Sequence, residues 1–195
     1  ADPNISDNSG RTPLIEASSN GHTNIAKMLL EKGVDRDIAN EEGETALIIA
    51  CRWGHANTAE LLLEKGADPN TSDNDGETPL IKSCSGGYTD AVELLLDKGA
   101  DPNISNQEGS TPLNIASKDG QTYIAKLLLA KGAYPNISKF QDFFDRRDQG
   151  ENIQDNSEGE KNPVSRLEDI IHEIVQYPFY AEKFSELYQE NPEIV

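Results

Sequence analysis

One metal-binding pattern that the sequence approaches lies near the C-terminus. His172 and Glu173 begin an H-E-x-x-H motif, in which two histidines on one helix face bind zinc and the glutamate acts as a base. Gln176 stands where the second histidine should be, so the zinc site is incomplete. No other cysteine or histidine cluster has metal-ligand spacing, and no nucleophile elbow or glycine-rich phosphate loop is present. We therefore expect no catalytic residue, no metal and no cofactor, and predict that the chain is not an enzyme.

The remaining reactive residues are explained by a repeat. Cys51 and Cys84 lie 33 residues apart, and so do His22 and His55. The segment "GRTPLIEASSNGHTNIAKMLLEKG" recurs three times at that spacing without insertion or deletion, so four copies occupy residues 10–33, 43–66, 76–99 and 109–132. A fixed period of this length is typical of repeat architectures.

Each copy predicts two short helices and a hairpin. Thr12 is a good helix N-cap, and Pro13 suits the first helical position because its missing N–H is not needed there. Gly21 separates the first helix from the second, and Gly33 follows the second as a C-cap glycine. One unit cannot bury its leucine-rich stripe alone, so we expect an all-α solenoid of stacked units.

These units resemble the ankyrin-repeat family, whose pattern is D-x-x-G-x-T-P-L-H-x-A-A-x-x-G-H followed by x-L-L-L-x-x-G-A-D-x-N. The resemblance covers roughly residues 1–138, and it implies an ankyrin-repeat domain over residues 1–142. The predicted repeats are about 1–33, 34–66, 67–99 and 100–132, with a partial fifth at 133–142. In place of the family's histidine after T-P-L stand Ile15, Ile48, Ile81 and Asn114.

The repeat also predicts the state of the cysteines. Stacked helices lie about 8–10 Å apart, whereas a disulfide needs Cα atoms within about 7 Å. We therefore expect Cys51 and Cys84 to be packed, unpaired thiols, which fits a reducing compartment. We ascribe His22 and His55 to the family's structural G-H pair. The N-x-S triplets are ascribed to a repeat position that demands asparagine rather than to glycosylation.

Partner contact in this family uses the hairpin tips and the exposed residues of each first helix, its concave face. Trp53 falls there, and its counterparts Asn20, Gly86 and Asp119 vary as a core position would not. Trp and Arg are enriched at binding hot spots, and Arg52 is adjacent. Packing of Trp53 on Tyr88 or a neighbouring helix is the open alternative. The predicted partner-binding residues are Arg11, Glu41, Glu42, Glu44, Arg52, Trp53, Asp75, Glu77, Glu108, Lys118 and Asp119.

Charge limits the class of partner. The 195 residues contain 17 Lys and Arg against 35 Asp and Glu, a formal charge of −18. Such a chain repels nucleic acids and anionic membranes, so we expect neither as a partner. A protein with a basic or mixed surface is the complement. No stretch is long and apolar enough for a transmembrane helix. We expect a cytoplasmic location, including a host cytoplasm if the protein is an injected effector.

The sequence pattern changes after residue 142, where the repeats end. Residues 143–162 are polar and acidic without periodicity, which predicts a linker. Residues 163–195 contain two amphipathic patterns and predict helices. These helices either cover the last repeat or form a docking or self-associating element, and the sequence leaves both open. The chain opens part-way through a repeat, so we also expect its native N-terminus to lie outside this sequence.

The function expected from these features is a non-catalytic scaffold that binds a partner protein through an acidic concave face. Three alternatives stay open. One is an inhibitor or immunity-type protein that covers the basic site of a toxin or nuclease. Another is the targeting arm of a larger multidomain enzyme or bacterial effector. The third is a structural assembly held together through residues 163–195.

Overall fold

The computed structural model describes residues 4–134, and this part of the chain contains eight α-helices and no strand. The predicted linker at 143–162 and the predicted helices within 163–195 lie outside the described residues. The helices are α1 Pro13–Ser19, α2 Thr23–Glu31, α3 Ala46–Arg52, α4 Ala56–Glu64, α5 Pro79–Gly86, α6 Thr89–Asp97, α7 Pro112–Lys118 and α8 Thr122–Ala130. The predicted all-α repeat solenoid is confirmed over these residues.

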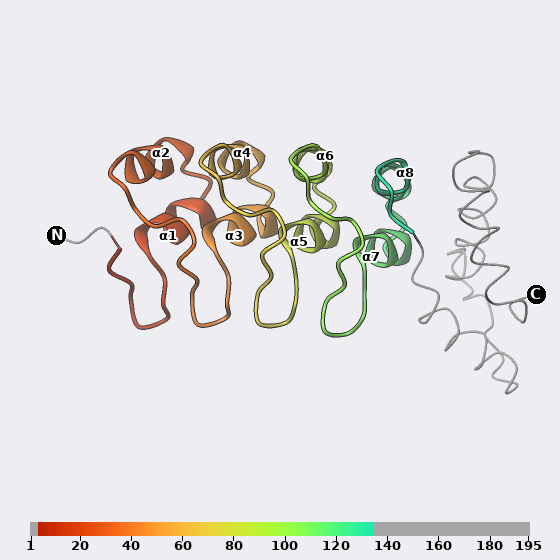
Figure 1. The fold of residues 1–195 in the computed structure, drawn as a ribbon, viewed down its shortest axis with the longest axis horizontal. Coiled ribbons are helices and arrows are strands. Elements are labelled where there is room, and N and C mark those ends of the chain that lie inside the picture. Colours follow the sequence, from red (N-terminus) through yellow and green to blue (C-terminus); the bar gives the residue numbers. More distant parts are fainter. Residues whose placement is uncertain (1–3, 135–195) are drawn as a thin grey trace, which may run out of the picture. The chain divides into compact units, whose positions relative to one another are not determined.

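The helices form two layers (Figure 1). The inner helices α1, α3, α5 and α7 lie in one row, the outer helices α2, α4, α6 and α8 lie in a second, and the hairpins project on the far side of the inner row. Each inner helix packs on its own outer helix and on the inner helices of adjacent repeats. A helix that contacts neighbours on both sides buries most of its surface, which explains how such short helices are stable.

The start of every inner helix is capped as predicted. Each N-cap threonine accepts a hydrogen bond on its hydroxyl from the backbone N–H three residues later, at 3.3–3.4 Å. The four caps are Thr12, Thr45, Thr78 and Thr111. A proline at the first helical position follows three of them. The hydroxyls therefore satisfy helix N–H groups that have no carbonyl partner within the helix.

Glycines end the helices by adopting left-handed backbone angles. Gly21 has φ 65° in the reversal between α1 and α2, and Gly33 has φ 78° after α2. The N–H of Gly33 donates to Leu30 O at 3.0 Å, and the N–H of Val34 donates to Leu29 O at 3.3 Å. This pair of bonds is the Schellman arrangement, so the predicted glycine C-cap is confirmed.

The core lies between the two helix layers. The residues that replace the family's histidine are buried there in the first three repeats, since Ile15, Ile48 and Ile81 are at most 1% exposed. In the fourth repeat Asn114 accepts the backbone N–H of Thr111 at 3.1 Å and completes a capping box. Apolar packing therefore replaces a polar brace in three repeats, and an amide supplies one in the fourth.

A repeated asparagine links successive repeats. The side-chain oxygen of Asn70 accepts the N–H of Asp101 at 2.8 Å, and its amide donates to Gly99 O at 3.4 Å. Asn103 makes the same two bonds one repeat later, to Tyr134 N and Gly132 O. The prediction that the repeat demands asparagine here is confirmed for both positions.

Candidate protein-binding surface

The predicted contact residues gather on what we call the inner surface, which consists of the hairpin tips and the C-terminal ends of the inner helices. Trp53 lies on it as the C-cap of α3; its N–H donates to Ile49 O at 3.2 Å, and the N–H of Gly54 donates to Cys51 O at 3.2 Å. The Trp53 residue is 54% exposed. The predicted solvent-facing position is therefore confirmed, and Trp53 is not a core residue. The fixed backbone around it presents the indole from a defined place at the end of the helix.

A second aromatic ring, that of Tyr88, packs on Gly54, the residue after Trp53. A Cβ built on Gly54 would lie 2.6 Å from Tyr88 Cδ1, and one built on Gly86 would lie 2.1 Å from Tyr88 Cε2. The ring of Tyr88 therefore packs directly on the backbone of both glycines, across the junction of repeats two and three. Gly86 is the counterpart of Trp53 in the next repeat, so no side chain follows the indole along this row. The ring of Tyr88 instead occupies the space that a side chain at residue 86 would take.

Arg52, the residue before Trp53, is held by two carboxylates. Its guanidinium forms an ion pair with Glu44 and lies 3.9 Å from Glu42 Oε2. The Arg52 side chain is 35% exposed, whereas the Glu44 side chain is 1% exposed. Glu42 is exposed at its hairpin tip. The Arg52 guanidinium thus remains accessible to solvent, and the buried Glu44 carboxylate fixes its position.

The prediction that Glu44 is an exposed contact residue is wrong. Its carboxylate accepts a hydrogen bond from the Asn40 amide at 3.1 Å and faces Arg52. Burial raises the pKa of Glu44 above its ordinary value, although the Asn40 hydrogen bond and the charge of Arg52 lower it in part. Its carboxylate is covered by the Arg52 guanidinium and the Asn40 amide. It therefore acts as a support for Arg52.

Lys82 is a buried charge that the sequence interpretation missed. It lies in α5 and is 8% exposed. Its ammonium group is 2.9 Å from Asp73 Oδ2 and also pairs with Glu77. Burial alone would lower the pKa of Lys82, but the hydrogen bonds to Glu77 and Asp73 outweigh it and raise that pKa.

The two carboxylates on Lys82 also shape the third hairpin. Asp73 Oδ1 accepts the N–H groups of Asp75 at 3.0 Å and Glu77 at 2.8 Å. The predicted contact residue Glu77 is therefore partly buried and already paired. The signal that could have indicated this site is a lysine that follows the hairpin acids Asp73 and Glu77, at a position occupied elsewhere by Glu16, Ile49 and Ile115.

Adjacent hairpins are joined at their tips. The N–H of Asn74 donates to Glu42 O at 3.0 Å, and the N–H of Gln107 donates to Asp75 O at 2.9 Å. These bonds place three equivalent acids, Glu42, Asp75 and Glu108, on successive linked hairpins. We call these three residues the acidic row.

The other predicted contact residues also lie on exposed parts of the inner surface. Within residues 4–134, neither Asp75 nor Glu108 has an ion-pair partner, and neither does Glu41. Arg11 lies 3.5 Å from Glu16 in a solvated pair. The remaining exposed members are Lys118 and Asp119. The structure thus brings the predicted set onto one surface, with Glu44 withdrawn from it and Glu77 partly so.

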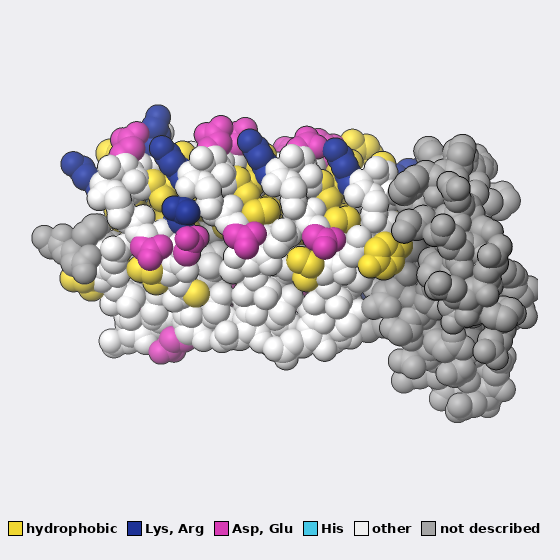
Figure 2. Space-filling model, viewed as in Figure 1, with side chains coloured by type: hydrophobic (Ala, Val, Ile, Leu, Met, Phe, Trp, Pro, Cys, Tyr) yellow, Lys and Arg dark blue, Asp and Glu magenta, His cyan; other side chains and the backbone are white. Residues whose placement is uncertain are grey.

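A different face of the stack has mixed charge. Figure 2 shows Lys and Arg side chains spaced along the edge formed by the outer helices, with Asp and Glu side chains among them. The outer helices are each followed by a cap lysine, at Lys32, Lys65, Lys98 and Lys131. Opposite charges there are close enough to compensate, as in the pair of Lys131 with Asp97 at 2.8 Å.

The cysteines are unpaired, as predicted. Cys51 and Cys84 are both completely buried, and burial raises the pKa of each thiol to about 12. A thiol that stays protonated at neutral pH is a poor nucleophile and a poor metal ligand. Among the described residues, no group of three or more His, Cys, Asp and Glu is placed to hold a metal ion, and no helix could cross a membrane.

Comparison with known proteins agrees with this architecture. A family model of ankyrin repeats in three copies matches residues 1–73 and matches again over residues 67–139. No curated protein matches the chain.

Proposed function

This chain belongs to the ankyrin-repeat family, whose repeats are generally protein–protein interaction modules, and on that basis we propose that it binds a partner protein through its inner surface. The partner presents a basic or mixed surface to the acidic row. Trp53 is the central anchor, and Arg52 is a second contact beside it. The protein acts as a scaffold without catalysis of its own, as is typical of the family.

The observation that carries this proposal is the exposure of Trp53. An indole that is half exposed at a fixed helix end offers a large apolar area to a partner. Because its helix end is hydrogen-bonded and Arg52 is held by Glu44, little conformational entropy is lost when a partner binds. Trp and Arg are among the residues most enriched at binding hot spots, which cluster near the centre of an interface.

The acidic row supports the proposal that the partner's surface is basic or mixed in charge. Asp75 and Glu108 have no ion-pair partner in the described part of the chain, so their charges remain available. A row of like charges on linked hairpins attracts a basic surface and speeds its association at low salt. Neutralising these acids should therefore lower the association rate more than it raises the dissociation rate.

The proposal is tested by affinity capture with the wild type and Trp53→Ala side by side, followed by titration calorimetry with the captured protein. We expect Trp53→Ala to weaken binding by about 2–4 kcal/mol, as for other central anchors. The matched control is Tyr123→Ala, which removes an aromatic residue that is 61% exposed on the outer helix α8. The control should bind like the wild type.

The charge of the partner is tested separately. The triple variant Glu42→Gln, Asp75→Asn and Glu108→Gln should bind with a weaker dependence on salt concentration than the wild type. A very steep salt dependence together with a toxin or nuclease as the captured protein would favour the inhibitor alternative. A partner that binds Trp53→Ala as tightly as wild type would refute the inner surface as the site and direct attention to residues 163–195.

A further inference from the structure

One asparagine of this chain is followed by a glycine. Asn20 is the C-cap of α1, and Gly21 makes the reversal into α2 with φ 65°. None of the other asparagines in the sequence precedes a glycine. The backbone nitrogen of the next residue can attack the side-chain carbon of an asparagine, and glycine allows this most readily because it has no Cβ in the way. The pair of Asn20 and Gly21 is therefore where such a reaction meets the least steric resistance.

The side chain of Asn20 is exposed, and its amide is held by one neighbour. The amide nitrogen donates to Glu16 O at 2.8 Å and to Glu16 Oε1 at 2.9 Å. These two bonds direct the amide back along α1. A hollow of about 470 Å³, which Asn20, Glu16 and His22 help to line, leaves room for water at this end of the helix. Attack on the side chain is thus slowed by Glu16 and not by burial.

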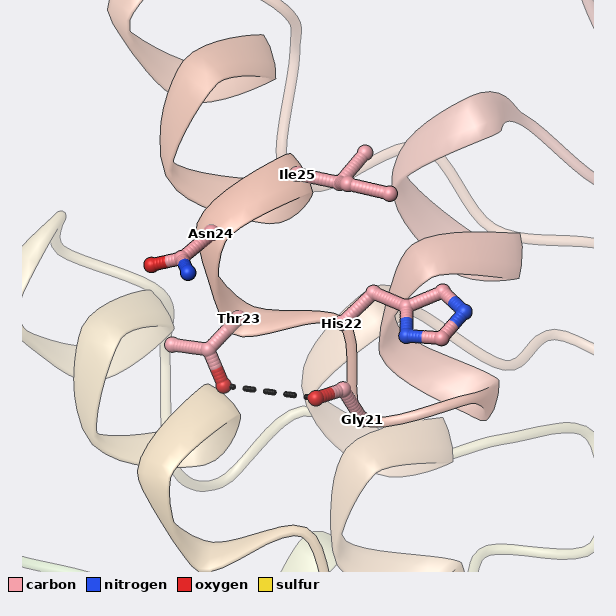
Figure 3. A pocket seen from close by; sticks show the side chains of 5 residues that line it. All are labelled: Gly21, His22, Thr23, Asn24 and Ile25. Atoms are coloured by element: carbon pink, nitrogen blue, oxygen red, sulfur yellow. Dashed lines mark hydrogen bonds between the residues drawn. The ribbon is translucent and has the colours of Figure 1, made fainter.

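The backbone of Gly21 is fixed from the other side. Its carbonyl oxygen accepts the N–H of Thr23 at 2.9 Å and lies 3.5 Å from the Thr23 hydroxyl, the contact drawn in Figure 3. The N–H of Gly21 donates to Ser18 O at 3.3 Å, which is long for such a bond. A second hollow, of about 460 Å³, is lined by residues 21–25. The nitrogen that would attack is therefore only weakly engaged.

A histidine of the second repeat lies against Gly21. A Cβ built on Gly21 would lie 2.6 Å from His55 Nδ1, so the imidazole occupies the space in which another residue would carry its side chain. The Nε2 atom of His55 lies 3.1 Å from Ser19 O. Because a carbonyl oxygen can only accept, Nε2 carries a proton, and Nδ1 of the neutral ring keeps a free lone pair. A proton acceptor thus lies against the glycine whose N–H must lose its proton.

The later repeat junctions lack this combination. The counterparts of Asn20 are Trp53, Gly86 and Asp119, none of which has a side-chain amide. The counterparts of His55 are Tyr88 and Gln121, and neither side chain acts as a base at neutral pH. Among the described repeats, an asparagine, a following glycine and an imidazole come together at the junction of the first and second.

We infer that Asn20 is a site of self-modification, in which the Gly21 nitrogen attacks Asn20 Cγ and the side chain becomes a carboxylate. The proton of the Gly21 N–H passes to His55 Nδ1 as the new C–N bond forms. The C–N bond of the side-chain amide then breaks, and ammonia leaves with the proton of the imidazolium. Water opens the resulting succinimide ring at either carbonyl, which gives aspartate or isoaspartate. The net change is one water consumed and one ammonia released, with no oxidation or reduction.

The two products differ in how they fit the end of α1. Asp119 has φ −87° and ψ 4° at the equivalent C-cap, close to φ −99° and ψ 2° at Asn20. An aspartate at residue 20 therefore keeps the helix end and adds a negative charge to the inner surface. Isoaspartate adds an atom to the main chain, which breaks the register of the bond from His22 N to Ala17 O at 2.9 Å. Any effect of this change on a partner rests on the proposed function, whereas the modification itself does not.

The inference is tested by incubating wild type and His55→Gln at neutral pH, both folded and unfolded in urea. Peptide mapping by mass spectrometry then counts aspartate and isoaspartate at residue 20. Gln121 shows that the repeat accommodates glutamine at the position of His55. We expect folded His55→Gln to react about tenfold more slowly or slower still, because a positioned base contributes at least that factor. The two chains should react equally in urea, where His55 no longer lies against Gly21.

Two further variants and an internal control complete the test. Glu16→Ala removes the side-chain acceptor of the amide and should speed the reaction of the folded chain several-fold. Asn20→Gln should abolish it, because the attack would have to close a larger ring. Asn24 is exposed and precedes an isoleucine, so it should stay unmodified over the same period. A folded wild type in which Asn20 reacts no faster than Asn24 would overturn the site, and a folded His55→Gln that reacts as fast as wild type would overturn the role of His55.

Discussion

The guanidinium of Arg52 lies at the inner surface because the carboxylate of Glu44 holds it from below. Arg52 belongs to the end of α3 and Glu44 to the hairpin that precedes it. The two residues therefore couple the hairpin to the helix end that carries Trp53. This pair is half solvated, since Arg52 is partly exposed while Glu44 is buried. The two members should consequently respond differently to mutation.

Removing Arg52 should lower the free energy of unfolding more than neutralising Glu44 does. Arg52→Met leaves a buried carboxylate without its cation, and we expect the free energy of unfolding to fall by about 2 kcal/mol, less than for a fully buried pair. Glu44→Gln keeps the shape and a hydrogen-bond acceptor for Asn40, so its cost should stay below about 1 kcal/mol. Urea unfolding at pH 7 measures both.

The pH dependence of stability in Arg52→Met tests whether the buried Glu44 carboxylate causes the loss. Folding raises the pKa of Glu44, so the folded state holds a proton there more tightly than the unfolded state. Stability from this group therefore increases as pH falls towards the ordinary glutamate value, about 4.3, and decreases as pH rises. The loss in Arg52→Met should shrink between pH 7 and pH 5. Equal losses at the two pH values would contradict the role given to Glu44.

Lys82 should contribute a pH-dependent part of the stability. Lys82→Met leaves Asp73 and Glu77 without their cation, and we expect a loss of about 2–4 kcal/mol at pH 7. The pKa of Lys82 is raised by folding, so its contribution is fully present below the unfolded value, about 10.4, and is lost as pH rises through the folded value. The stability difference between wild type and variant should be constant from neutral pH to about pH 10 and should decrease above it.

The matched control for Lys82→Met is Lys98→Met, which changes an exposed lysine at the C-cap of α6. We expect it to cost less than about 1 kcal/mol, the usual value for a cation near a helix C-terminus. A Lys82 loss no larger than the Lys98 loss would show that the buried pairings add nothing to stability. Chemical denaturation over the same pH range provides the comparison.

The fold was predictable because it rests on local signals repeated four times. Threonine caps, helix-ending glycines and leucine stripes each act within one unit, so the spacing alone indicated where the helices lie. The exposure of Trp53 was predictable for the same reason, since its counterparts are Asn20, Gly86 and Asp119. A position that accepts an amide, a glycine and an acid is not under core packing constraints.

The buried charges were not predictable in this way. Glu44 shares its position with Arg11, Glu77 and Ser110, a set that indicates an exposed position. Its burial depends on Arg52 and Asn40, whose side chains contact it only in the folded repeat. Lys82 is likewise enclosed by hairpin acids that precede its helix. Such contacts depend on tertiary geometry that the repeat period does not contain.

Restoring an asparagine in the second repeat should stabilise the stack. Asp37 stands where Asn70 and Asn103 link their repeats to the next. The Asp37 side chain makes no hydrogen bond to Gly66 or Asp68 in the described part of the chain. Asp37→Asn supplies an amide donor for Gly66 O, and we expect a gain of about 1 kcal/mol, or about 2–4 °C in Tm for a chain of this size.

The reverse change provides the control for that prediction. Asn70→Asp removes the donor to Gly99 O and leaves the acceptor for Asp101 N in place. It should cost about 1 kcal/mol, the value of one such hydrogen bond. Thermal melts of both variants measure the asparagine link in opposite directions. If both variants had the same Tm as the wild type, the asparagine link would make no contribution to stability.

Replacing Gly86 with alanine should destabilise the protein, although Gly86 is the last residue of α5. Alanine has the better helix propensity by about 1 kcal/mol, so propensity alone predicts a gain. A Cβ at this position would lie 2.1 Å from Tyr88 Cε2, however, and Gly54 backs the same ring from the other side. Gly86→Ala therefore forces the ring out of place, and we expect a net loss of about 1–3 kcal/mol, as in other overpacked sites.

The fourth repeat supplies the compensating change. There Gln121 replaces Tyr88 and Asp119 replaces Gly86, so a side chain is tolerated when the ring is absent. Gly86→Ala in a Tyr88→Gln background should accordingly cost much less than in the wild type, which a double-mutant cycle from urea unfolding measures. Additive losses would mean that the ring of Tyr88 is not what excludes the alanine. The same cycle, measured through partner affinity, shows whether the Tyr88 ring beside Gly86 takes part in binding.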